Sequence, residues 1–205
     1  LDQAESHFYE AAKLAPTNHQ IQLNLAVLRL QSTNPPVAQA AEKSLETLSQ
    51  HDATRQEALR HLIQMARQRH GLAKAESYSR QLQAAPEAGF DDRLLHLSIL
   101  TEMGNAEAAP YLSTLQPAAE STPEHILALG TWMIGQKQTD QALTWLNQLP
   151  DASRQQQPVM MALAEIHVAK EDWPRLLSLL RDQSWGDSEA LRLALLARAG
   201  SMMGE

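Results

Sequence analysis

The sequence has no cysteine among its 205 residues, which excludes disulfides and cysteine-ligated zinc sites. Aromatic residues make up only 4%, and the residues that favour strands are sparse. No apolar run approaches the ~20 residues needed to span a bilayer. Lysine and arginine are outnumbered by aspartate and glutamate, 17 to 24, and they form no basic run. An acidic chain of this kind is a poor ligand for phosphate backbones, so we expect no nucleic-acid partner.

What remains favours helix almost everywhere. Alanine, leucine and glutamine dominate, and apolar residues recur at intervals of three and four. Proline, glycine, asparagine and aspartate mark the ends of these segments. The pattern predicts about twelve helices and no strand. We expect them at 1–15, 19–31, 37–50, 53–70, 72–85, 91–104, 106–116, 121–136, 141–149, 155–170, 172–184 and from 187 onward.

Several residues are typical of particular helix ends. Gly71 is expected to stop the preceding helix as a left-handed C-terminal residue. Asp91 and Asp92 begin the next helix, where carboxylates cap free amides. Pro117 is expected to end the helix over 106–116. The segment Ser121-Thr122-Pro123-Glu124 resembles a capping box with proline in the first turn.

The first sixteen residues contain the most distinctive pattern in the chain. Ala4, Phe8, Ala11 and Pro16 stand at the intervals of the second helix of a tetratricopeptide repeat. The expected ends of alternate helices then recur at spacings of about 34 residues, the length of one helix–turn–helix unit. Long coiled coils are the alternative for such a composition, but proline or glycine interrupts every segment.

The chain therefore resembles a bacterial-type tetratricopeptide repeat (TPR) protein. The first helix of this family carries a Leu-Gly or Leu-Ala pair, followed twelve positions later by a small residue. In this sequence the pattern is matched by Leu129-Gly130 with Ala142 and by Leu163-Ala164 with Leu176. Leu25-Ala26 with Ala40 matches it with altered spacing. Two further sets follow the pattern less closely, namely Ile63 with Ala75 and Leu97-Ser98 with Ala109. The resemblance implies an all-α, right-handed α-solenoid of antiparallel helix pairs. It implies about five to six units, in one TPR-like domain over residues 1–205 that is a fragment cut in mid-repeat at both ends.

The resemblance also implies where a partner binds. In TPR proteins the first helices build the concave wall, and the family's offsets select partner-binding candidates here: Gln20, Val27, Glu57, Arg60, Gln64, Arg67, Gln68, Thr131 and Glu165. Arg60, Gln64 and Arg67 also share one helix face by their spacing, so two guanidiniums there would suit a carboxylate or an acidic peptide. The alternative is a solvated charged side of a long helix.

No motif of an enzyme is present. The sequence lacks Gly-x-Gly-x-x-Gly, the P-loop pattern, Gly-x-Ser-x-Gly and His-Glu-x-x-His. The histidines lack the spacing of metal ligands, and pairs such as His51-Asp52 and Glu124-His125 are adjacent, so on a helix they point apart. We therefore expect no catalysis, no cofactor and no bound metal.

The first functional hypothesis is a non-catalytic scaffold that presents a groove to a peptide, a helix or a protein. A second is a TPR segment of a bacterial envelope assembly, such as polysaccharide export or outer-membrane assembly. A third is a regulatory domain fused to an enzyme. We also expect self-association through apolar repeat ends, with the helix containing Leu191–Leu196 buried against a neighbouring molecule. The composition fits the cytoplasm or the periplasm and does not choose between them.

Overall fold

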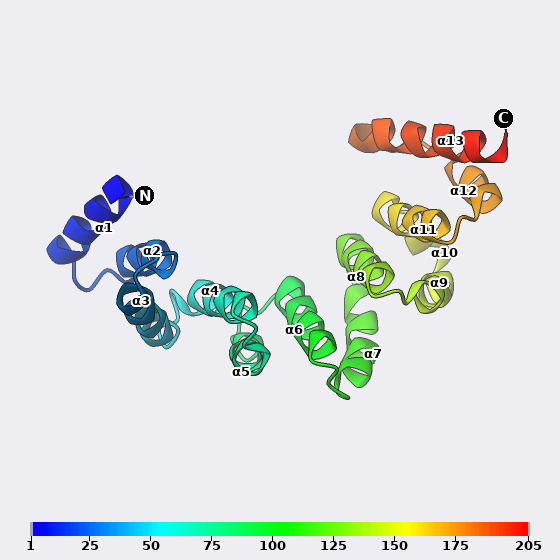
Figure 1. Cartoon of the computed structure of the whole chain (residues 1–205). Coiled ribbons are helices and arrows are strands. Elements are labelled where there is room, and N and C mark those ends of the chain that lie inside the picture. Colours follow the sequence, from blue (N-terminus) through cyan, green and yellow to red (C-terminus); the bar gives the residue numbers. More distant parts are fainter. Residues whose placement is uncertain (1, 205) are drawn as a thin grey trace. The chain divides into compact units, whose positions relative to one another are not determined.

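The computed structural model describes residues 2–204, and in that range it contains thirteen α-helices, one short 3-10 helix and no strand. Figure 1 shows the helices in chain order. The chain divides into two compact units, Leu1–Tyr111 and Leu112–Glu205, and the division falls inside one helix, α7. The elements are α1(Asp2–Leu14), α2(His19–Leu30), α3(Pro35–Leu48), α4(Arg55–Gln68), α5(Leu72–Gln83), α6(Phe90–Glu102), α7(Ala108–Ala119), α8(Pro123–Gly135), α9(Thr139–Gln148), α10(Asp151–Arg154), α11(Gln157–Ala169), α12(Trp173–Leu180), η1(Gly186–Ser188) and α13(Glu189–Met203).

In the first unit each helix packs on the next one along the chain, from α1 to α6. The core is densest around α4, where Leu59, Leu62 and Ile63 are at most 1% exposed. These three residues follow the interval of three to four that places side chains on one helix face. Consecutive helix packing of this kind is typical of repeat proteins, in which each element contacts only its neighbours.

In the second unit α8 packs on both α9 and α11, and α12 packs on α11 and α13. Gly130 explains the close approach of α8 to α11. A Cβ atom placed at Gly130 would lie 3.3 Å from the Cβ of Ala162 and 3.9 Å from Cδ1 of Leu146. A small residue is therefore required at this point of the helix contact, as the sequence predicted for Gly130.

A backbone turn recurs along the chain at the length of one repeat. Left-handed residues follow α4, α6, α8 and α11 at His70, Gly104, Lys137 and Glu171, which are 34, 33 and 34 positions apart. After each of them the next amide donates to a carbonyl five residues earlier, at 2.8 to 2.9 Å, from Gly71 to Ala66, Asn105 to Leu100, Gln138 to Met133 and Asp172 to His167. This is the Schellman arrangement of a helix C-terminus. The period inferred from the sequence is thus present in the backbone.

Several expected helix ends need correction. The left-handed residue after α4 is His70 with φ of 56°, whereas Gly71 has φ of −88° and precedes α5. The helix expected to stop before Pro117 continues to Ala119, which is fully buried. Packing of this last turn compensates for the backbone hydrogen bond that Pro117 cannot donate. Thr122 precedes α8 but makes no side-chain cap bond, so the expected capping box does not form, although Pro123 does open the helix.

The remaining elements agree with the expectation of about twelve helices without strands. Asp92 caps the start of α6, because its carboxylate accepts a 3.2 Å hydrogen bond from the Gly89 amide. The helices missed by the pattern are α10, which has only four residues, and the three-residue η1. Among the described residues none of the helices has both the length and the apolar character required to cross a bilayer.

The all-α class and the packing of consecutive helices are therefore confirmed. The right-handed solenoid and the single domain over 1–205 stay predictions. Compact units can be drawn inside any array in which each repeat contacts only its neighbours, so the division into two units does not decide the number of domains.

Candidate binding surface

The candidate residues lie on α2, α4, α8 and α11. Together with α6, these are the helices that we call the first helices, because each precedes the second helix of a pair. Their side chains join successive first helices. Gln20 donates to Glu57 at 3.4 Å, and Thr131 donates to Glu165 at 2.7 Å. Arg60 and Arg67 pair with carboxylates on α6. The partners are separated by 37, 34, 32 and 35 positions, close to one repeat.

The Arg60–Asp92 pair is the most buried of these contacts. The guanidinium donates two hydrogen bonds, of 2.8 and 2.9 Å, one to each carboxylate oxygen. The Asp92 side chain is only 3% exposed, while that of Arg60 is half exposed. The hydrogen bonds to Asp92 and the negative charge of that carboxylate raise the pKa of Arg60. Arg60 thus holds a carboxylate of its own chain.

Arg67 is engaged in the same way with Glu102, one of whose oxygens accepts at 3.2 Å from Nε. Both side chains of this pair are more than a third exposed. Arg60 and the Arg67–Glu102 pair border a cavity of about 390 Å³ between α4 and α6, lined by Arg60, Ile63, Gln64, Arg67, Gln68, Leu95 and Glu102. The guanidiniums are therefore fixed at the edge of a cavity, but their charges are already compensated.

Gln64 and Gln68 face two cavities at once. Besides the cavity just described, they line a smaller one of about 200 Å³ between α2 and α4, together with Val27 and Leu30. Both glutamines are exposed, and among the described residues neither side chain has a hydrogen-bond partner. We call the face around these two cavities the first-helix face of the first unit. It gathers the candidates Val27, Arg60, Gln64, Arg67 and Gln68.

The second unit has a cavity on its own first helices. It measures about 330 Å³, and seven of its eight lining residues are apolar. Glu165 of α11 is the single charged residue there, and α13 contributes Leu191 and Leu195. Thr131 and Glu165, the candidates of this unit, are thus brought together, whereas Gln20 and Glu57 pair at α2 and α4 of the first unit.

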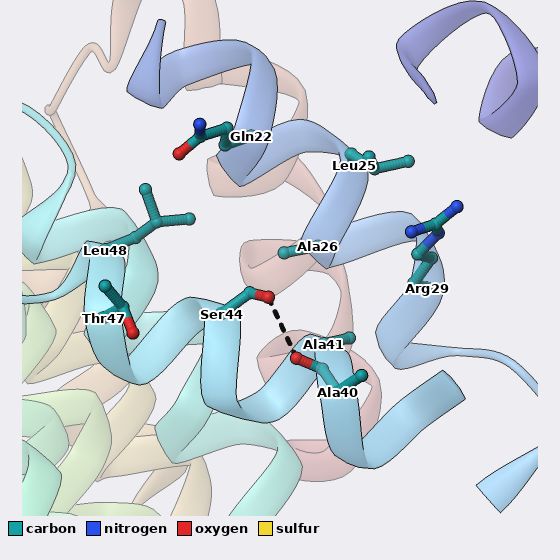
Figure 2. A pocket seen from close by; sticks show the side chains of 9 residues that line it. All are labelled: Gln22, Leu25, Ala26, Arg29, Ala40, Ala41, Ser44, Thr47 and Leu48. Carbon is teal, nitrogen blue, oxygen red and sulfur yellow. Dashed lines mark hydrogen bonds between the residues drawn. The ribbon is translucent and has the colours of Figure 1, made fainter. Parts of the chain in front are cut away.

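A further cavity lies between α2 and α3, and its lining includes Ala26 and Ala40, the small residues of one predicted repeat pair. It measures about 280 Å³ and its lining is shown in Figure 2. Ala26, Ala40 and Ala41 leave the space open, and the Ser44 hydroxyl is satisfied by the Ala40 carbonyl at 2.9 Å. No charged group other than Arg29 lines it, and Arg29 pairs with Glu5 at 2.9 Å.

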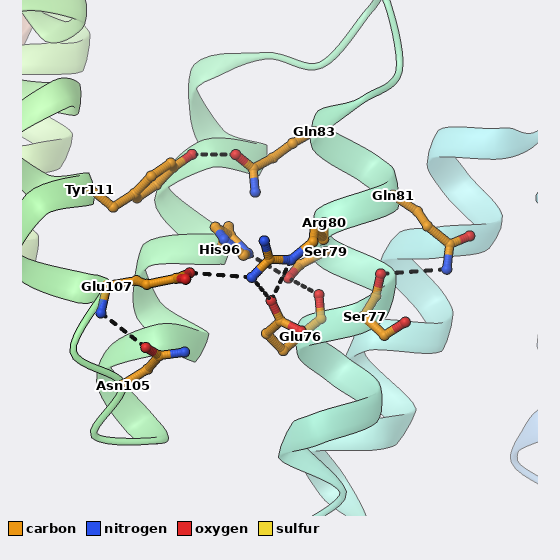
Figure 3. Close-up of polar contacts among 10 residues, drawn as sticks. All are labelled: Glu76, Ser77, Ser79, Arg80, Gln81, Gln83, His96, Asn105, Glu107 and Tyr111. Carbon is orange, nitrogen blue, oxygen red and sulfur yellow. Dashed lines mark hydrogen bonds and ion pairs between the residues drawn. The ribbon is translucent and has the colours of Figure 1, made fainter.

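A polar network ties α5 to α6 and to the first turn of α7 (Figure 3). The fully buried Ser79 contacts Nδ1 of His96 at 2.8 Å, and Arg80 bridges Glu76 at 2.7 Å and Glu107 at 3.3 Å. Burial lowers the pKa of His96 below its usual value. Ser79 and His96 are buried between packed helices and so lack the open access that a nucleophile needs. The sequence reasoning missed this network, since no residue spacing indicated it.

No group of three or more potential metal ligands is found among the described residues. The rings of His19 and His51 stack, with their centroids 3.9 Å apart. The spacing of His51 and its neighbour Asp52 in the sequence did not predict this contact.

No protein-family model matches the chain, and neither does any curated protein. The class established by the structure is thus an all-α protein of consecutively packed helices, and the TPR resemblance stays a prediction.

Proposed function

We propose that the chain is a non-catalytic scaffold that binds a protein or peptide along its first helices, as a right-handed superhelix of TPR-like units. One observation carries the proposal: residues selected as one repeated surface are neighbours across successive first helices. Gln20 with Glu57 and Thr131 with Glu165 are each pairs of two selected residues. The turns at 33- to 34-residue intervals support the same register.

The first-helix face of the first unit is the proposed contact surface. Gln64 and Gln68 supply exposed amide donors and acceptors between two cavities, while Val27 and Leu30 supply apolar area beside them. Exposed amides without internal partners lose little when they exchange water for a partner's backbone groups. Arg60 and Arg67 then act mainly by fixing α6 against α4, because their charges are compensated by Asp92 and Glu102.

A photocrosslinking experiment tests the proposal. A photoreactive amino acid replaces Gln68 on a first helix or, as a matched control, the exposed Gln81 on the second helix α5. The intact chain is irradiated in its native cells, and the adducts are identified by mass spectrometry. We expect a defined protein adduct from position 68 that is weak or absent from position 81, and that is reduced by Gln64→Ala. Equal adducts from both positions would contradict the proposal.

The two other hypotheses, a segment of a bacterial envelope assembly and a regulatory part of an enzyme, stay predictions. Identification of the crosslinked partner distinguishes them, because an envelope protein supports the former and an enzyme the latter.

A further inference from the structure

We infer that the cavity between α11 and α13 is a second binding site, which takes a peptide segment carrying an apolar side chain next to a lysine or an arginine. The inference rests on the proposed function in one respect, because it takes the partner to be a polypeptide. Unlike the first-helix face of the first unit, this site is apolar and carries an uncompensated negative charge.

The shape and lining of the cavity determine the apolar part of the ligand. Met161 and Val168 of α11 face Leu191 and Leu195 of α13 around a volume of about 330 Å³. This volume is at the small end of known ligand sites and suits one aliphatic or aromatic side chain. Leu191 is 45% exposed, so the cavity opens to solvent and leaves apolar surface in contact with water. Covering such surface favours binding of an apolar group.

The single carboxylate determines the charged part of the ligand. Glu165 lines the cavity and is exposed. Its Oε2 accepts a 2.7 Å hydrogen bond from the Thr131 hydroxyl, which fixes the carboxylate without neutralising it. Among the described residues no lysine or arginine pairs with Glu165, whereas Asp92 and Glu102 of the first unit each face an arginine. A partner cation beside the apolar side chain would complete the site.

The wall of the cavity is held in place without a ligand. Trp185, which is 1% exposed, lines the cavity, and its backbone amide donates to Glu189 at 2.9 Å. Arg192 in turn donates to the Leu180 carbonyl at 2.8 Å and pairs with Glu189. The segment between α12 and α13 is thus tied at both ends. A preformed wall reduces the ordering cost of binding.

The test is a titration of the intact, ¹⁵N-labelled chain at low salt, read from the indole N–H signal of Trp185, which Trp185→Phe assigns. The probe is N-acetyl-leucyl-lysine amide, and the matched probes are N-acetyl-leucyl-glutamine amide and N-acetyl-alanyl-lysine amide. We expect saturable shifts of the Trp185 signal, with the leucyl-lysine probe binding about threefold more tightly than the leucyl-glutamine probe, as an exposed ion pair predicts. The alanyl-lysine probe is expected to bind more weakly still.

Two variants separate the charged from the apolar contribution. Glu165→Gln, with Glu124→Gln as the charge-matched control, is expected to abolish the preference for lysine. Leu191→Gln is expected to weaken both leucyl probes alike, whereas Leu193→Gln, at an exposed position on the same helix outside the cavity lining, is expected to leave them unchanged. A silent Trp185 signal, or a lysine preference that survives Glu165→Gln, would overturn the inference. Neither result depends on the crosslink from position 68, so this inference and the proposed function fail separately.

Discussion

The guanidinium of Arg60 on α4 grips the carboxylate of Asp92 on α6 through two hydrogen bonds, of 2.8 and 2.9 Å, and Asp92 is 3% exposed in its side chain. The same carboxylate accepts from the Gly89 amide at the start of α6. One buried acidic group therefore both caps a helix and joins two repeats. Its negative charge has no cationic partner other than Arg60 among the ion pairs of the described residues.

We predict that Arg60→Gln lowers the free energy of unfolding by about 1–2 kcal/mol, because it leaves a buried carboxylate without its cation. The control is Arg67→Gln, whose partner Glu102 is more than a third exposed. The free energy of unfolding of Arg67→Gln is expected to fall by less than about 1 kcal/mol, as for other exposed ion pairs. Urea denaturation of both variants makes the comparison, and equal losses would contradict the assignment.

The recurring left-handed residues lead to a second prediction. Lys137 occupies φ of 61°, a region that is unfavourable for residues with a Cβ atom, whereas Gly104 fills the equivalent position after α6. We expect Lys137→Gly to stabilise the chain by about 0.5–1 kcal/mol and Gly104→Ala to destabilise it by about 1 kcal/mol. Thermal denaturation by circular dichroism measures both. Changes of the same sign in the two variants would be incompatible with the repeated turn.

The contact of α8 with α11 gives a third prediction. Since a Cβ at Gly130 already lies 3.3 Å from that of Ala162, Gly130→Leu is expected to force the helices apart and cost about 1–3 kcal/mol. Gly135, in the last turn of the same helix, has no atom within 4 Å of an added Cβ. Gly135→Ala is therefore expected to be neutral or to stabilise the helix by up to about 1 kcal/mol. Chemical denaturation of the two variants tests the difference.

Stability is also expected to depend on pH through His96. Burial lowers the pKa of this histidine in the folded chain, so the unfolded chain binds more protons. Its contribution to stability is full above the ordinary pKa of about 6.5 and is lost as the pH falls toward the folded-state value. Glu76, Arg80 and Glu107 surround it and modify this effect. We expect His96→Gln to flatten the fall in stability between about pH 7 and about pH 5, measured by urea denaturation at each pH.

Much of the fold could be predicted because it is local. Proline, glycine and asparagine mark helix boundaries, and the apolar spacing of three and four places Leu59, Leu62 and Ile63 on the buried face of α4. The errors arose where tertiary packing or backbone geometry decides. His70 adopts the left-handed conformation expected of Gly71, and the burial of Ala119 carries α7 past Pro117.

The candidate surface was predictable only in part. The repeat offsets selected Gln20, Glu57, Thr131 and Glu165, which the structure brings together in pairs. The same offsets did not predict that Arg60 forms an ion pair with Asp92. The two residues are about one repeat apart, and no local sequence pattern indicates such a pairing. Nor did the offsets reveal the Ser79–His96 contact, which joins the inner sides of α5 and α6.

The register of the repeats can be measured directly, since the chain has no cysteine of its own. Cysteines introduced by Thr131→Cys and Glu165→Cys replace two residues whose Oγ1 and Oε2 atoms lie 2.7 Å apart, although the residues are 34 positions apart in sequence. The control pair, Thr144→Cys with Glu165→Cys, is closer in sequence but places one cysteine on the exposed side of the second helix α9. Rapid disulfide formation under mild oxidation is predicted for the first pair and slow formation for the second. Equal rates, or faster closure of the control pair, would contradict the stacking of successive first helices on which the proposed binding surface depends.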